Sequence, residues 1–428
     1  MSIPRLLYAD QDGNILDHPG LGLAGSAAGR WEAVTEAQCI PLPPGSELFL
    51  LPGRRPVGVG DDGRFEVLAH DPSGGGRPVS AVAAFLAPAH TATLWAAYRR
   101  DPGAPNLPLF AYAAVGFARG RMVTTALRVD PLPRQDPERF PPPQRLQAAA
   151  KRLLRRFGDN RLMQHLGHCA LGYGCPAARN LMLGRWEAPL PTAAACNASC
   201  VGCISSQPEG LFPVTQERIA FTPYPEEVAE VALHHFATGR DPMVSFGQGC
   251  EGEPLTQGEL LEESIRLIRA KEPRGTVNLN SNGSLPGVVA RLMEAGLSSI
   301  RVSVNSLIPE RHQAYYQPKG WSLKDALDSI KVVKAAGGHA SLNLLTLPGV
   351  TDRPEEAQAL HQVVEETGLD LIQWRNLNID PEVYLEALGL EPPEERLGVA
   401  ELIAGLKRRF PALKHGYFNP KLEASRRD

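Results

Sequence analysis

The sequence has no excess of positive charge and no long apolar run. Its 428 residues carry 44 Lys and Arg against 47 Asp and Glu, which gives no overall electrostatic footprint for nucleic acid. No stretch of the chain approaches the roughly 18 uninterrupted apolar residues of a membrane span. The first ten residues lack a basic segment followed by an apolar one, so we expect no signal peptide and predict a cytoplasmic protein.

Cysteine is scarce as well. Seven cysteines, unevenly placed in 428 residues, do not make a disulfide scaffold and indicate metal-binding or catalytic thiols. Three of them, Cys196, Cys200 and Cys203, follow the spacing C-x3-C-x2-C. A structural zinc or a fully ligated iron–sulfur cluster takes four protein ligands, usually from two separated pairs. A triplet leaves one coordination position open, and chemistry at a metal requires such a position.

Composition divides the chain into four regions. Residues 1–140 are rich in glycine and proline, with short apolar runs between turn signals, and predict a small β-rich N-terminal domain. Residues 141–185 form a predicted helical linker that begins with a basic helix over 144–157 and contains Cys169 and Cys175. Residues 186–380 are the predicted core. Residues 381–428 are predicted as a helical C-terminal extension, with helices over 381–388 and 396–410 and a charged tail.

The core alternates strand and helix patterns, which predicts an α/β fold with a parallel sheet and right-handed crossovers. In such sheets the reactive site lies at the carboxyl ends of the strands. Polar or glycine-rich segments follow each expected strand, beginning with the cysteine triplet and the segment 247–254. We predict strands over 190–196, 243–246, 276–280, 299–304, 340–345 and 369–374, and helices over 225–237, 258–271, 285–295, 323–336 and 354–367.

In this context the motifs resemble the radical S-adenosylmethionine (SAM) superfamily over residues of about 186–380. The resemblance implies a partial (βα)6 TIM-type barrel. It also implies that Cys196, Cys200 and Cys203 hold a 4Fe–4S cluster whose fourth iron chelates SAM. Segment 251–254 looks like the family's GGEP element, with Glu251 in place of its first glycine. By this resemblance Glu253 and nearby backbone groups would receive the SAM amino group, which needs carboxylate and carbonyl acceptors. Glu251 and Gly252 would also belong to the cofactor-binding segment.

The later strands supply the remaining matches. Asn280 and Asn282 match the turn after the third strand, and Ser303 and Asn305 match positions that commonly bind the SAM ribose or carboxylate. Gly349 matches a position where the backbone approaches adenine, and Arg375 and Asn378 would meet the SAM carboxylate or the substrate. The sequence departs from many members at Gly202, where an aromatic residue usually contacts adenine; Ile204 is a candidate replacement.

The resemblance implies an enzyme that reductively cleaves SAM to a 5′-deoxyadenosyl radical, which then abstracts hydrogen from a substrate. The expected partner is an electron donor such as flavodoxin or ferredoxin. The substrate is not identified: the lack of positive charge favours a peptide, a protein or a small molecule, while the basic residues 151–156 leave RNA open. No membrane partner is expected.

The remaining cysteines keep several interpretations. Cys169 and Cys175 lie beside His165 and His168, so they could bind an auxiliary iron–sulfur cluster, bind zinc, or be buried and inert. Cys250 stands beside the predicted SAM-binding acid. It is a candidate catalytic residue that would donate a hydrogen atom to a substrate radical, but it could also ligate a second cluster or simply pack.

Two other classes of protein compete with the enzyme. A binding protein with a structural zinc would need a fourth ligand close to the triplet, yet no Cys or His lies between Cys203 and His234. An iron–sulfur electron carrier without SAM chemistry would leave the motifs after the later strands without a purpose.

Overall fold

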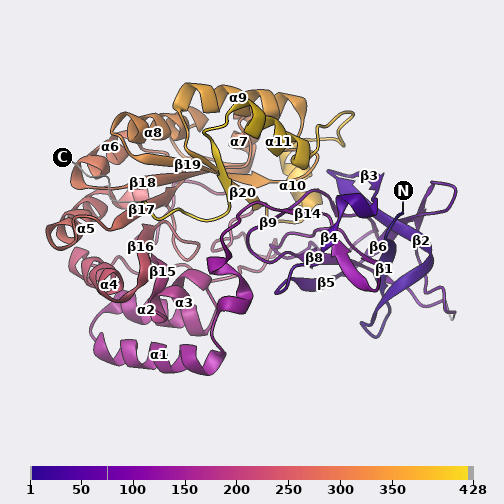
Figure 1. The fold of residues 1–428 in the computed structure, drawn as a ribbon, viewed down its shortest axis with the longest axis horizontal. Helices are drawn as coiled ribbons and strands as arrows, with labels where there is room; N and C mark the ends of the chain where they lie inside the picture. The colour runs from indigo at the N-terminus through magenta and orange to yellow at the C-terminus, as the bar shows by residue number, and fades with distance from the viewer. Residues whose placement is uncertain (1, 75, 423–428) are drawn as a thin grey trace.

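The computed structural model describes residues 2–74 and 76–422 (Figure 1). An antiparallel β-rich region formed by the first part of the chain lies beside a curled parallel sheet with helices on its outer face. The predicted α/β class, with a partial barrel preceded by a β-rich region, is confirmed. Residues 423–428, the end of the predicted charged tail, lie outside the described residues. Within the described part of the chain, no helix is long and apolar enough to cross a bilayer.

The β-rich region consists of a 12-stranded sheet and a two-stranded ribbon, β9 with β14. Its strands pair antiparallel and mostly with near neighbours in sequence, as the turn-rich composition predicts. The strands are β1 (Arg5–Ala9), β2 (Ile15–Ala27), β3 (Arg30–Ala33), β4 (Ile40–Pro41), β5 (Glu47–Leu51), β6 (Arg54–Val59), β7 (Phe65–Val67), β8 (Ser80–Phe85), β9 (His90–Ala92), β10 (Trp95–Ala96), β11 (Tyr98–Arg100), β12 (Val115–Ala118), β13 (Arg121–Thr124) and β14 (Ala126–Arg128).

Three helices connect this region to the parallel sheet, where the sequence predicts a helical linker. They pack on one another, and α3 also packs against the first strand of the parallel sheet (Figure 1). They are α1 (Pro143–Arg156), α2 (Arg161–Leu171) and α3 (Pro176–Met182).

The parallel sheet has seven strands in sequential order, each paired parallel with the next. The strands are β15 (Arg185–Pro189), β16 (Arg240–Phe246), β17 (Thr276–Ser281), β18 (Ser299–Val304), β19 (His339–Thr346), β20 (Leu371–Asn376) and β21 (Lys414–Gly416). The helices are α4 (Pro225–Thr238), α5 (Gly258–Lys271), α6 (Pro286–Ala295), α7 (Pro309–Tyr316), α8 (Leu323–Ala335), α9 (Pro354–Thr367), α10 (Pro381–Leu388) and α11 (Val399–Arg409).

The two faces of this sheet differ in chemistry because side chains alternate along each strand. One set of side chains is apolar and almost completely buried, as a face covered by helices requires; it includes Val244, Phe246, Val277, Leu279, Ile300, Val302, Leu342, Ile372 and Trp374. The other set is polar and linked by hydrogen bonds across the strands; it includes Ser245, Asn278, Asn280, Ser299, Ser303, Asn343 and Gln373. The curled sheet therefore encloses a polar interior.

Three predicted details differ from the structure. The first strand is β15 and not residues 190–196, because the polar side chains of β15 conceal the strand pattern while Leu190 and Ala193 are buried in the following loop. Helix α7 was not predicted, although Pro309 at its first turn is a helix-start signal. Strand β21 also escaped prediction, since three residues carry too little periodicity to be recognised.

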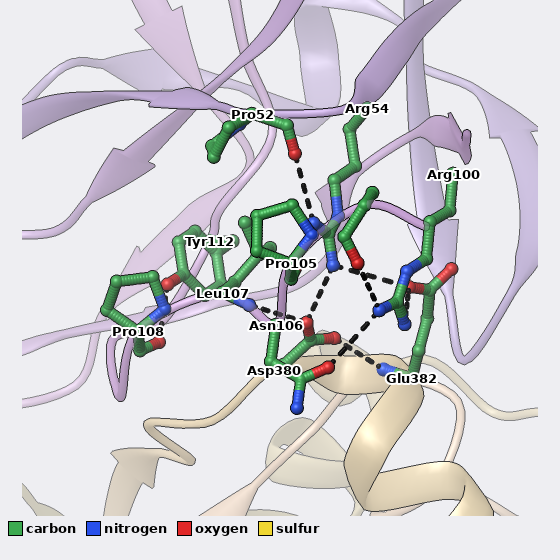
Figure 2. Close-up of polar contacts among 11 residues, drawn as sticks. Pro52, Arg54, Arg100, Pro105, Asn106, Leu107, Pro108, Tyr112, Asp380 and Glu382 are labelled. Atoms are coloured by element: carbon green, nitrogen blue, oxygen red, sulfur yellow. Dashed lines mark hydrogen bonds and ion pairs between the residues drawn. The ribbon is translucent and has the colours of Figure 1, made fainter. Parts of the chain in front are cut away.

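A buried ion pair joins the β-rich region to the parallel sheet (Figure 2). The Arg54 guanidinium donates to the Asp380 carboxylate at 2.8 Å, and both side chains are 0% exposed. Asp380 also accepts from the backbone N–H of Leu107 at 2.8 Å. At the rim, Arg100 pairs with Glu382 at 3.3 Å. Because Asp380 is the N-cap of α10, the β-rich region is attached close to the carboxyl end of β20.

Candidate functional site

The loop that follows β15 carries the cysteine triplet and is held by the end of α7. The backbone N–H groups of Ser199 and Val201 donate to the carbonyls of Tyr316 and Tyr315, at 3.0 and 2.9 Å. The indole Nε1–H of Trp321 donates to the Asn197 carbonyl at 2.8 Å. The loop is thus fixed by a helix that sequence reasoning missed, and this attachment sets the position of the three thiols.

The three thiols lie close enough to influence one another's ionisation. Burial raises the pKa of Cys200, and the neighbouring Cys203 and Cys196 raise it further. Burial also raises the pKa of Cys196, with Glu253 and Cys203 adding to the effect. Three thiolates gathered this way are costly unless a cationic group lies among them, as metal coordination provides. The donor set therefore fits a metal cluster held by Cys196, Cys200 and Cys203.

Glu251 connects the loop after β15 to the loop after β16. One carboxylate oxygen accepts from the backbone N–H groups of Thr192 and Ala193, at 2.7 and 3.1 Å. The other accepts from those of Gly247 and Gln248, at 2.7 and 2.9 Å. Burial raises the pKa of Glu251 to about 7, against these stabilising bonds. Both of its oxygens are engaged within the chain, so its predicted contact with SAM stays a prediction.

Gly252 and Glu253 lie directly against the cysteine loop. The Glu253 N–H donates to the Ala195 carbonyl at 3.0 Å, and a Cβ on Gly252 would lie only 1.9 Å from that same carbonyl oxygen. Only glycine permits this approach. The Glu253 carboxylate accepts from the Ser281 hydroxyl at 2.6 Å and from the Asn282 backbone N–H at 2.9 Å. Burial raises its pKa to about 7. The predicted SAM-binding acid is therefore brought beside the predicted cluster ligands.

The turn after β17 joins the same group of loops. The Asn282 amide donates to the Asn197 side-chain oxygen at 2.9 Å, and the Asn197 amide donates to the Ser284 hydroxyl at 2.9 Å. Asn280 lies deeper: its amide donates to the Phe246 carbonyl at 2.9 Å and its oxygen accepts from Asn419 at 2.9 Å. Asn282 thus lies among the loops that meet at the cysteine triplet, whereas the hydrogen bonds of Asn280 join strands of the polar interior.

Polar groups without partners lie at the carboxyl ends of β18 and β19. Asn343 donates to the Ser303 hydroxyl at 2.9 Å, and Asn305 donates to the Tyr384 hydroxyl at 3.0 Å. The side-chain oxygens of Asn305 and Asn343 are buried and have no hydrogen-bond partner among the described residues. Buried acceptors without donors are costly, so they indicate a polar ligand. Tyr384 contacts Tyr315, with ring centroids 5.7 Å apart, and so links Asn305 to the cysteine loop.

Gly349 and Arg375 have contacts that the sequence did not predict. Gly349 has φ of 85°, and a Cβ there would lie 2.5 Å from the backbone of Ala27. The close approach that requires glycine is thus to the β-rich region, which is a different reason from the predicted contact with adenine. Arg375 donates to the Tyr417 carbonyl at 3.2 Å and lies over the Tyr417 ring at 4.2 Å. Asn378 lies near Gly202, whose Cβ would be 3.6 Å from its carbonyl oxygen.

Arg301 is a further polar residue of the interior that the sequence did not single out. Burial, together with the neighbouring Arg375, lowers its pKa to about 10. Its Nε atom is buried with no hydrogen-bond partner within the described residues. The only signal in the sequence was an arginine within a strand that otherwise alternates small and apolar side chains.

Cys250 does not lie among the triplet. It is 2% exposed and adjoins Cys169 and His165 of α2, and the ligand atoms of these three residues all lie within 4.8 Å of one another. The hydrogen bond from Cys250, together with His165, lowers the pKa of Cys169. The backbone N–H of Cys175 donates to the Cys169 carbonyl at 3.0 Å. Two groups of cysteines therefore occupy two different places beside the same loops.

Comparisons with known proteins agree with this geometry. Residues 190–360 match the model of the radical SAM superfamily. The chain is 31% identical over 159 residues to GTP 3′,8-cyclase of Pseudomonas entomophila, covering 37% of this chain and 44% of that protein. It is 26% identical over 180 residues to the FeMo cofactor biosynthesis protein NifB of Klebsiella pneumoniae, covering 38% of this chain and 37% of that protein. The chain thus spans less than half the length of both relatives.

Among solved structures, the FeFe-hydrogenase maturase HydG from Carboxydothermus hydrogenoformans superposes with a TM-score of 0.38 at 14% identity, covering 64% of this chain and 68% of that one. Proteins of the radical SAM superfamily bind a 4Fe–4S cluster and SAM, and the matched segment contains the cysteine triplet and the loops that converge on it. Residues 190–360 of this chain, which include the cysteine triplet, thus match the radical SAM superfamily.

Proposed function

We propose that this protein is a radical SAM enzyme in which Cys196, Cys200 and Cys203 hold a 4Fe–4S cluster. The observation that carries the proposal is the convergence of three thiols, the Glu253 loop and the Asn282 turn at one edge of the parallel sheet. When bound, the cluster and SAM supply the reductive cleavage that generates a 5′-deoxyadenosyl radical.

The chain's own groups bind and orient the cofactor. The three thiolates would hold the cluster and leave one coordination position for SAM, and the adjoining Glu253 loop would receive the SAM amino group. The unpartnered oxygens of Asn305 and Asn343 are suited to accept from hydroxyl groups such as those of the ribose, with Ser303 between them. The buried aromatic rings of Tyr315, Tyr316 and Tyr384 keep water away from the reacting groups.

The polar interior supports a proposal about the substrate. Arg301 and Arg375 place two guanidinium groups inside the curled sheet, and neither forms an ion pair within the described residues. Half-buried guanidinium groups without a carboxylate partner favour carboxylate or phosphate ligands. We therefore propose a substrate with an anionic group, held beyond SAM at the carboxyl ends of the strands. We also propose that an electron donor such as flavodoxin or ferredoxin is a partner of this protein.

The test is anaerobic reconstitution with iron and sulfide, followed by SAM and dithionite. The proposal expects 5′-deoxyadenosine and methionine to accumulate together, and the product to disappear in Cys200→Ala. Cys39→Ala is the matched control, because Cys39 packs in a separate small core of the β-rich region. An intact cluster that forms no 5′-deoxyadenosine would contradict the proposal and would favour an iron–sulfur protein without SAM chemistry.

A further inference from the structure

A second group of metal-ligating side chains lies outside the cysteine triplet. His165 and Cys169 come from α2, four residues apart and therefore on one face of the helix. Cys250 comes from the loop after β16, more than 80 residues later in the chain. The fold brings one ligand atom from each of them within 4.8 Å of the others, and Cys169 and Cys250 are buried.

The spacing of these atoms fits one metal ion. The Cys169 sulfur lies 3.5 Å from His165 Nε2. In a tetrahedral site with Zn–S near 2.3 Å and Zn–N near 2.0 Å, a sulfur and a nitrogen ligand lie about 3.5 Å apart. The cysteines of an iron–sulfur cluster bind different iron atoms, so their sulfurs must be farther apart than ligands of a single ion. The compact arrangement therefore favours a mononuclear site over an auxiliary cluster.

A fourth ligand is within reach. Cys175 is the N-cap of α3, and its backbone N–H donates to the Cys169 carbonyl at 3.0 Å, which fixes it next to Cys169. Three thiolates and one imidazole make a Cys3His set, which is typical of structural zinc. His168 is a less suitable candidate, because its side chain is exposed and contacts the Tyr173 ring.

We propose that His165, Cys169, Cys175 and Cys250 form a structural Zn²⁺ site that ties the helical linker to the loop after β16. The site would fix the residue directly before Glu251, whose carboxylate joins the loops after β15 and β16. The Cys250 carbonyl also accepts from the Ile219 N–H at 2.8 Å, so this loop is held from the other side as well. The metal then supports the cofactor-binding loops without taking part in the reaction.

The experiment separates this site from the triplet. In a chain carrying Cys196→Ala, Cys200→Ala and Cys203→Ala, purified under anaerobic conditions, metal analysis should find about one zinc per chain. After exchange with Co²⁺, thiolate-to-cobalt charge-transfer bands and the intense visible bands of tetrahedral cobalt should appear. Because this triple variant lacks the cysteine triplet, the result does not depend on SAM chemistry.

Adding Cys169→Ser or Cys250→Ser to the same chain should abolish zinc and the cobalt bands, whereas adding Cys39→Ser should leave both unchanged. Circular dichroism verifies that each variant is folded. If a variant is unfolded, the folded triple variant is used in its place. A chelator should remove its zinc, and addition of Co²⁺ should then restore the cobalt spectrum. Iron and sulfide in place of zinc, or no metal in the folded triple variant, would overturn the proposal.

Discussion

The Arg54–Asp380 pair lets the attachment of the β-rich region to the parallel sheet be tested quantitatively. Both side chains are fully buried and 2.8 Å apart, and Asp380 also accepts from Leu107 (Figure 2). Replacing Asp380 with Ala removes the nearer carboxylate of the buried Arg54 guanidinium, leaves it with Glu382 at 3.6 Å, and leaves the Leu107 N–H unsatisfied. Removing one side of a buried pair costs about 3–5 kcal/mol, because the remaining charge stays in the interior with a weaker partner.

Urea unfolding monitored by circular dichroism and tryptophan fluorescence measures this cost. Asp380→Ala should lower the free energy of unfolding by about 3–5 kcal/mol, or detach the β-rich region in a separate early transition. The double variant Arg54→Met/Asp380→Leu should recover part of the loss, since no charge is then buried alone. Lys324→Ala is the control, because its ion pair with Asp328 is exposed and worth at most about 1 kcal/mol. A loss below about 1 kcal/mol in Asp380→Ala would refute the reasoning.

Three further predictions concern the site. Gly252→Ala should reduce the iron bound by the reconstituted protein several-fold, because its Cβ would meet the Ala195 carbonyl, whereas Gly287→Ala, with open space around it, should not. Arg301→Met should raise the midpoint of thermal unfolding, because it removes a charge that has no carboxylate partner. It should also lessen the stabilisation of the protein by inorganic phosphate. A lower midpoint would contradict this prediction. His312 of α7 stacks on the Tyr316 ring at 4.6 Å, and burial lowers its pKa to about 4. Its contribution to the free energy of unfolding is therefore complete above pH 6.5 and is lost as the pH falls toward 4, by up to about 3 kcal/mol. His312→Phe should therefore show a smaller decrease in unfolding free energy between pH 7 and 5 than His70→Phe.

Most of the parallel sheet was predictable because its helices are long and amphipathic and its strands carry one apolar face. Helix α5 and strand β18 begin and end where the sequence indicates. Strand β15 was displaced by five residues in the prediction, because its polar side chains face the interior and the apolar signal belongs to the buried loop after it. Local pattern cannot distinguish a buried loop from a strand when both are apolar.

The loops of the candidate site could be predicted from the sequence, but the contacts that hold these loops in place could not. The spacing of the cysteines and the segment around Glu253 can be recognised in the sequence. The groups that fix the cysteine loop, which are the backbone carbonyls at the end of α7 and the Trp321 indole after it, carry no such motif. The grouping of Cys250 with His165 and Cys169 depends on a crossing of α2 with the loop after β16. Such long-range contacts follow from tertiary packing, which single-sequence periodicity does not encode.

The most direct test of the central claim is the electron paramagnetic resonance spectrum of the reconstituted, dithionite-reduced protein before and after addition of SAM. The reduced protein should give the signal of a 4Fe–4S cluster whose g values shift when SAM binds at the open coordination position. The signal should be lost in Cys196→Ala and retained in Cys39→Ala. A cluster signal that SAM leaves unchanged, or one that persists without Cys196, Cys200 and Cys203, would contradict the account.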